Sequence, residues 1–138
     1  PSRADIPPHL NFAPFENALT ALTKSAERYE AALGKAWFAG VPPETLRVLN
    51  RALIDSERRL TDPAGLLRRP WYKHLLYAPG VYTGYGVKTV PGVREAIEAK
   101  AWAEADAEIA RVAKALMAES AHVDELASVL ERSNARMP

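Results

Sequence analysis

The fold of this chain is decided by eleven residues near its middle, Arg69-Pro70-Trp71-Tyr72-Lys73-His74-Leu75-Leu76-Tyr77-Ala78-Pro79. Pro70 and Pro79 lack a backbone N–H, and each restricts the residue before it to extended conformations. Such a segment must be ordered by tertiary contacts, because it cannot build a hydrogen-bond ladder of its own. An extended, aromatic-rich connection inside a helical protein also indicates a functional segment.

The connection continues as Gly80-Val81-Tyr82-Thr83-Gly84-Tyr85-Gly86, in which glycines alternate with tyrosines. We expect residues 69–91 to be non-helical over most of their length. The aromatic side chains of Trp71, Tyr72 and Tyr77 are expected to hold the first part of this segment in place. The glycine-rich tip offers little side-chain packing, so we expect it to be more mobile than the helices.

Helical patterns precede this connection. Prolines at positions 7, 8 and 14 predict an extended lead-in over residues 1–14, and the first helix follows from Phe15. Pro43, in the first turn of the next periodic segment, predicts the start of a second helix. The apolar positions expected to face the core are Leu19, Leu22, Ala26, Tyr29 and Leu33 in the first helix, and Leu46, Leu49, Leu53, Ser56 and Leu60 in the second.

After the connection, the pattern predicts a short helix from Pro91 and a long helix from Trp102 to Leu130, followed by a frayed tail over residues 131–138. No stretch shows a convincing strand alternation. The predicted fold class is therefore all-α, an up-and-down helical bundle of about four helices with one long irregular connection. The whole chain, residues 1–138, is expected to form a single domain.

Composition excludes several classes of function. The 138 residues include 18 basic and 17 acidic side chains, so there is no electrostatic case for a nucleic-acid partner. There is no cysteine, which excludes disulfides and thiolate metal ligands. No apolar run approaches the roughly 18–20 residues of a membrane span. The start at Pro1 suggests an excised fragment or a processed product.

No catalytic or metal-binding constellation is evident in the sequence. The three histidines, His9, His74 and His122, have no partner at metal-ligand spacing, and no serine lies in a nucleophile-elbow sequence. We interpret the acidic residues of the helices, Glu27, Glu30, Glu104, Asp106 and Glu108, as solvated faces. The three tryptophans, Trp37, Trp71 and Trp102, belong either to the core or to a protein interface.

The sequence resembles the carboxy-terminal domain of the glutamate carboxypeptidase and transferrin receptor family. The resemblance is carried by Arg69 to His74, Tyr77-Ala78-Pro79 and Pro91-Gly92, by Leu46 to Asn50, Glu57-Arg58 and Asp62 to Leu66 upstream, and by Trp102 and Ile109 downstream. In that family this domain is a helical module that mediates homodimerisation. Zinc-dependent peptidase chemistry belongs to a separate, preceding domain, against which this domain packs.

The resemblance also implies a binding role for the tip of the connection. Where the family's carboxypeptidases have a lysine followed by a tyrosine, both reaching the terminal carboxylate of the substrate, this chain has Gly84 followed by Tyr85. Tyr85 keeps a phenolic donor, whereas Gly84 removes a cation. Lys88 is close enough in sequence to supply charge. Two interpretations of His74 remain open: it is either a hydrogen-bonded structural residue or a residue behind the substrate pocket.

These implications predict a chain that is not an enzyme alone and needs no cofactor, with zinc in the missing peptidase domain. The larger protein would be a homodimeric, glutamate-carboxypeptidase-like metallopeptidase, and the resemblance favours an extracytoplasmic location. Two alternatives remain open at this point. One is the dimerisation module of a catalytically inactive receptor or scaffold, and the other is a free-standing helical binding protein.

Overall fold

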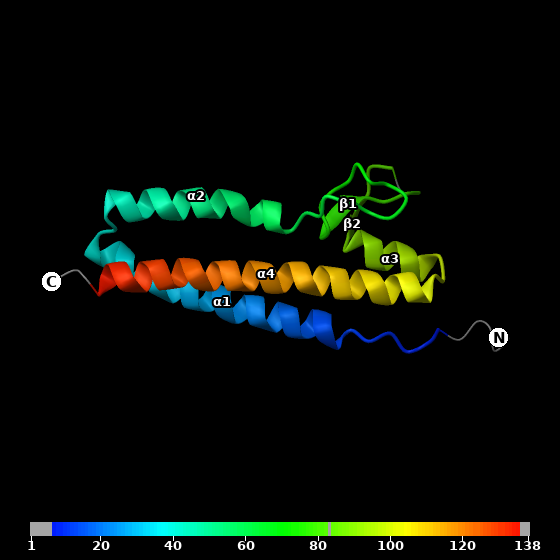
Figure 1. Cartoon of the computed structure of the whole chain (residues 1–138), viewed down its shortest axis with the longest axis horizontal. Helices are drawn as coiled ribbons and strands as arrows, with labels where there is room; N and C mark the ends of the chain where they lie inside the picture. Colours follow the sequence, from blue (N-terminus) through cyan, green and yellow to red (C-terminus); the bar gives the residue numbers. More distant parts are fainter. Residues whose placement is uncertain (1–6, 83, 136–138) are drawn as a thin grey trace.

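The computed structural model describes residues 7–82 and 84–135, and most of this part is helical (Figure 1). The four helices are α1 (Ala13–Ala39), α2 (Pro43–Arg59), α3 (Pro91–Glu98) and α4 (Trp102–Asn134). The strands β1 (Tyr77–Pro79) and β2 (Val87–Thr89) form a small antiparallel sheet within the connection. The expectation of an entirely helical fold is wrong on this point. The two strands are only three residues long, too short for an alternating pattern to be recognised.

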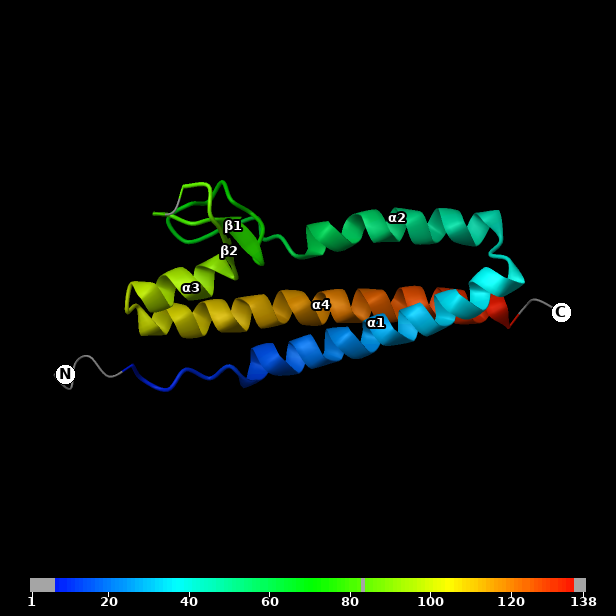
Figure 2. The same cartoon turned by 180° about the vertical axis from the view of Figure 1, so that it is seen from behind.

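The helices form a bundle organised around α4. Helices α1, α2 and α3 each pack against α4, and Figures 1 and 2 show α2 and α3 following one another along its length. The chain therefore runs up through α1, back through α2 and α3, and up again through α4, which lies parallel to α1. The expected up-and-down path is present, but α2 and α3 share one descending leg.

Small residues line the contact between α1 and α4. The buried residues of α1 are Ala18, Ser25, Ala32 and Ala36. The hydroxyl groups of Ser25 and Ser120 lie 2.8 Å apart across the interface, so both polar groups are satisfied. The predicted stripe of larger residues is displaced from this line: Leu22, Tyr29 and Leu33 are half-buried, and Leu19 is exposed. Small side chains let two helix backbones approach closely, and the larger ones then pack beside the line of contact.

Helix α2 is attached less extensively. Its one buried residue is Leu49, which packs with Ala32 and Ala36 of α1 and Leu126 and Leu130 of α4. Leu46 and Leu53, which were expected to face the core, are 40% and 42% exposed. This part of the sequence therefore carries more apolar surface than the described residues cover.

The ends of the long elements differ slightly from expectation. Helix α1 begins at Ala13, inside the expected extended lead-in, and residues 7–12 have no regular structure. Helix α4 continues to Asn134 instead of fraying from residue 131. Residues 1–6 and 136–138, at the outer ends of the predicted lead-in and tail, lie outside the described residues.

The irregular connection is non-helical from Leu60 to Val90, as predicted for residues 69–91. Leu66, Leu75 and Ala78 bury their side chains in the main core with Ile109, among other residues. Trp71 is 68% exposed, so the expectation that it holds the segment in place is wrong. Leu66, Leu75 and Ala78 hold it in place together with Tyr72, which packs against the same core, and Tyr77, whose hydroxyl bonds to Glu57 of α2.

An ionic network fixes the start of the connection to α4. The guanidinium of Arg111 donates to Asp62 Oδ2 at 2.7 Å, to the carbonyl oxygen of Gly65 at 2.6 Å and to Glu108 Oε1 at 3.0 Å. Glu108, which we interpreted as part of a solvated face, is 4% exposed. A buried carboxylate requires a partner, and Arg111 supplies it one turn further along the helix.

The pH dependence of stability should report this network. The hydrogen bond from Arg111 holds the pKa of Asp62 below its ordinary value. Since the folded-state pKa is lower than the unfolded one, the stabilisation is present above about pH 4 and is lost as the pH falls. Asp62→Asn should lower the free energy of unfolding by about 1 kcal/mol at pH 7 and by less at pH 3. Urea unfolding at both pH values measures this difference.

Asp106→Asn is the control, because Asp106 is an exposed aspartate on α4, the helix that carries Arg111. It should leave the free energy of unfolding nearly unchanged at both pH values. An equal loss for Asp62→Asn at pH 7 and pH 3 would contradict the ionic role of Asp62.

Candidate functional site

The tip of the connection is a hairpin held above α3. Strand β1 pairs with β2 in the register Tyr77 with Thr89, Ala78 with Lys88 and Pro79 with Val87. The amide of Gly80 donates to the carbonyl oxygen of Gly86 at 3.1 Å, which closes the loop beyond the strands. We call residues 80–86 the hairpin tip. Thr83 lies outside the described residues.

Gly84 and Tyr85 project from this tip into solvent. Tyr85 is fully exposed, and Tyr82 is 93% exposed. Gly84 has a φ of +59°, and a Cβ added to it would meet no other atom within 4 Å. A residue with a side chain would fit sterically, but it would pay a backbone penalty for the left-handed conformation. The tip thus presents the phenol of Tyr85 fully to solvent.

Lys88 does not lie with Tyr85. Its side chain is 9% exposed, and its ammonium group pairs with the carboxylate of Glu98 on α3. The alternation of a strand places Lys88 on the face of β2 that covers α3, opposite the exposed Val87 and Thr89. Within the described residues, the hairpin tip therefore receives no cation from Lys88.

His74 lies at the other end of the connection, beside α2. Its ring stacks on Tyr77 with centroids 3.9 Å apart. Its Nδ1 accepts the amide of Leu76 at 3.1 Å, and its Nε2 lies 3.2 Å from Glu57 Oε1 without forming a hydrogen bond to it. The hydroxyl of Tyr77 donates to the same carboxylate at 2.5 Å, and this bond raises the pKa of Tyr77. His74 thus occupies a hydrogen-bonded cluster that joins the connection to α2.

Two charged residues at the base of the tip, Arg69 and Glu95, were not predicted from the sequence to belong to the site. Arg69 and Glu95 form an ion pair with both carboxylate oxygens 2.7 Å from Arg69 Nη2. They line a cleft of about 470 Å³ between the tip and α3, together with Leu67, Arg68, Val81, Tyr82, Glu98 and Ala99. Nothing in the sequence marks Glu95, because an acid on a short helix is ordinarily solvated.

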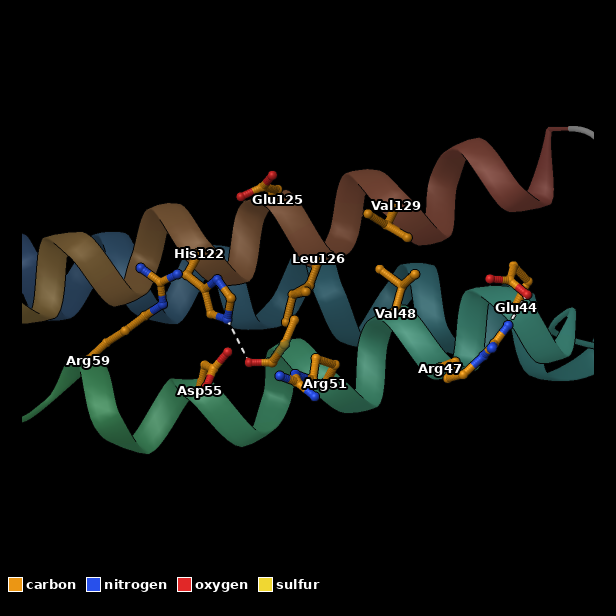
Figure 3. Close-up of a pocket in the computed structure, with 11 residues that line it drawn as sticks. Glu44, Arg47, Val48, Arg51, Asp55, Arg59, His122, Glu125, Leu126 and Val129 are labelled. Carbon is orange, nitrogen blue, oxygen red and sulfur yellow. Dashed lines mark hydrogen bonds and ion pairs between the residues drawn. The ribbon is translucent and has the colours of Figure 1, made fainter.

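A second, wider groove of about 640 Å³ runs between α2 and α4 (Figure 3). Val48, Leu126 and Val129 give it an apolar floor, and His122 accepts or donates a hydrogen bond at 2.9 Å to the carbonyl oxygen of Ala52. Arg47 at the rim pairs with Glu44 of its own helix. The groove carries charges of both signs and no pairing of nucleophile and base.

The described ranges, residues 7–82 and 84–135, contain neither a metal-ligand cluster nor a membrane-spanning helix. No group of three or more His, Asp or Glu side chains is placed there to hold a metal ion. None of the helices in these ranges combines the length and the apolar character needed to cross a bilayer.

The helical bundle with its hairpin connection is the part of the chain that matches a known family, the transferrin receptor-like dimerisation domain. The model of that family matches residues 10–124, and the chain belongs to this family. This confirms the resemblance found in the sequence.

Several curated relatives of this chain are named as probable glutamate carboxypeptidases. The chain is 46% identical over 78 residues to a probable glutamate carboxypeptidase of Arabidopsis thaliana, with 51% of this chain and 12% of that protein covered. It is 38% identical over 93 residues to a probable glutamate carboxypeptidase of Arthroderma benhamiae, with 67% of this chain and 13% of that protein covered. A third, from Zea mays, is 40% identical over 55 residues, which cover 40% of this chain and 8% of that protein. The matched part thus spans about an eighth of the length of the first two relatives.

We predict that this chain by itself binds no zinc stoichiometrically. The reason is that a tight site needs about four ligands in tetrahedral geometry, and the described residues offer no such group. Metal analysis of tag-free protein after dialysis measures this directly. One zinc ion per chain would contradict the prediction.

Proposed function

We propose that this domain holds two copies of a glutamate-carboxypeptidase-like zinc peptidase together, and that its hairpin tip lines the substrate pocket of the peptidase domain. The domain itself would contribute no catalytic group. Membership of the dimerisation-domain family supports the first role, and the names of the relatives support the peptidase branch. The small fraction of each relative that is matched leaves ample length for a preceding peptidase domain.

The observation that carries the dimerisation role is the uncovered apolar surface where α1 meets α2. Trp37 is 76% exposed and Phe38 is 93% exposed, at the end of α1. Ile54 on α2 is 62% exposed. We call the exposed apolar residues of this region, apart from Val48 in the groove between α2 and α4, the α1–α2 surface: Trp37, Phe38, Leu46, Leu53 and Ile54. Apolar surface of this extent indicates a protein interface, in which tryptophan and phenylalanine are enriched.

A second copy is the occupant that fits this surface best. Most of the other exposed apolar residues lie in the connection and its hairpin, for which the family resemblance implies contact with the peptidase domain, whereas Phe12, Leu19 and Met117 lie elsewhere. The α1–α2 surface is therefore free to meet the same surface of another copy across a two-fold axis. A stable dimer of this kind should bury at least about 1,000 Å² in total.

Replacing apolar residues of the α1–α2 surface should weaken the dimer. We predict that Phe38→Ser combined with Ile54→Lys raises the dimer dissociation constant at least about tenfold, because buried contact area is lost and one positive charge is introduced on each copy. Sedimentation analysis over a range of concentrations measures this constant. Met117→Ser is the matched control, because Met117 is equally apolar, 49% exposed and located on α4 outside this surface.

Helical content measured by circular dichroism should be the same for both variants. A wild-type protein that stays monomeric at high concentration would overturn the dimerisation role. Equal dimer affinity for the double variant and the wild type would place the interface elsewhere.

The proposed pocket role rests on Tyr85. A phenol at the tip can donate a hydrogen bond to the terminal carboxylate of a substrate held by the peptidase domain. Gly84 supplies no cation beside it, so we propose a weaker preference for acidic terminal residues than in relatives with lysine there. Zinc bound in the peptidase domain would supply the Lewis acid for hydrolysis, while this domain orients the substrate.

Removing the phenolic hydroxyl tests this role in the full-length protein. We predict that Tyr85→Phe lowers kcat/KM about tenfold for peptides with a free C-terminal carboxylate, since a hydrogen bond to a charged group is lost. Tyr82→Phe is the matched control, because Tyr82 lies on the same tip and is nearly as exposed. Gly84→Lys should shift preference toward acidic terminal residues. Unchanged kinetics for Tyr85→Phe would show that the tip does not line the pocket.

A further inference from the structure

The direction of the hairpin tip depends on how its base is held, because its two described tyrosines extend into solvent. Tyr82 and Tyr85 are exposed, and Gly84 has open space around it. By contrast, Gly80, where the chain leaves β1, is buried. The charged pair Arg69 and Glu95 lies at this point.

Arg69 and Glu95 hold the chain on both sides of Gly80. Arg69 Nη1 donates to the carbonyl oxygen of Pro79, and Arg69 Nη2 contacts both oxygens of Glu95 at 2.7 Å. Glu95 Oε1 in turn accepts the amide of Val81 at 3.1 Å. One carboxylate on α3 therefore connects the segment that precedes the hairpin to the first exposed residue of the tip.

This pair is shielded from water. The side chains of Arg69 and Glu95 are 9% and 15% exposed. The guanidinium also lies 5.2 Å from the centre of the Tyr72 ring, which restricts its orientation. A buried ion pair contributes little net stability compared with apolar packing, whereas its directional hydrogen bonds impose a geometry.

We propose that Glu95, acting with Arg69, is a positioning residue that sets the direction in which Gly84 and Tyr85 leave the hairpin. This inference rests on the proposed pocket role of the tip, which it extends to residues outside the tip. Glu95 does not touch substrate. It fixes the backbone at Pro79 and Val81, so that Tyr85 approaches the substrate carboxylate from one direction.

The neighbouring pair Arg68 and Glu104 provides a matched control. Arg68 Nη2 contacts both oxygens of Glu104, at 2.8 and 2.7 Å, in the same bidentate manner. This pair is more exposed and connects the segment to α4 instead of to the tip. Glu104→Gln therefore removes a charge of the same kind without releasing Pro79 or Val81.

The experiment compares Glu95→Gln and Glu104→Gln in the full-length protein. Glu95→Gln should raise KM at least about fivefold for a peptide with a free C-terminal carboxylate and change kcat less, because orientation of a bound group is lost. The same peptide with an amidated terminus should show no such difference. Hydrogen exchange at Val81 and along the tip should become faster. Glu104→Gln should match the wild type in all three measurements.

Arg69→Lys is a second variant in case Glu95→Gln folds poorly, since it keeps the charge and loses the bidentate contact. It should show the same rise in KM and the same faster exchange. Equal KM and equal exchange for Glu95→Gln and Glu104→Gln would overturn the inference, as would an equal rise in KM for the amidated peptide. A wild-type KM for Glu95→Gln together with a lowered kcat/KM for Tyr85→Phe would overturn the positioning role alone. Wild-type kinetics for both Glu95→Gln and Tyr85→Phe would overturn the proposed pocket role of the tip as well.

Discussion

The close contact between α1 and α4 is the constraint on which the rest of the structure depends. Ala18, Ser25, Ala32 and Ala36 allow the backbone of α1 to lie against α4, and the paired hydroxyls of Ser25 and Ser120 satisfy each other inside it. With α1 on one side, α4 offers its other faces to α2, α3 and the connection. A larger side chain in this line would separate the two helices and alter every contact that uses α4 as its platform.

Buried charges give the irregular connection its shape. Arg111 fixes its start at Asp62 and Gly65, and the pair of Arg69 with Glu95 fixes the base of the hairpin tip. Beyond the short ladder of β1 and β2 and the backbone bonds of the turns, side chains satisfy further backbone groups, such as the carbonyl oxygens of Gly65 and Pro79. The ionic groups thus determine where the chain goes, while aliphatic side chains supply most of the favourable burial.

The two proposed roles use different parts of the molecule. The corner between α1 and α2 lies toward one end of the bundle, and the hairpin lies toward the other (Figure 1). A second copy bound at the α1–α2 surface would therefore leave the tip free to face a peptidase domain. Because both surfaces belong to elements that pack against α4, pairing of two copies would also hold their two tips in a fixed relation.

Local sequence patterns were enough to predict the helical class, the starts of α2 and α3, the non-helical connection and the family. Prolines and helical periodicity act through the local backbone, and a motif such as Arg69 to His74 can be recognised without coordinates. Only the tertiary structure decided which apolar residues are buried, because Ala18 and Ala32 replaced the expected leucines once the helices approached closely. It also decided that Glu108 is buried and that Lys88 faces Glu98 instead of the tip. Those outcomes depend on partners distant in the chain, which no local pattern encodes.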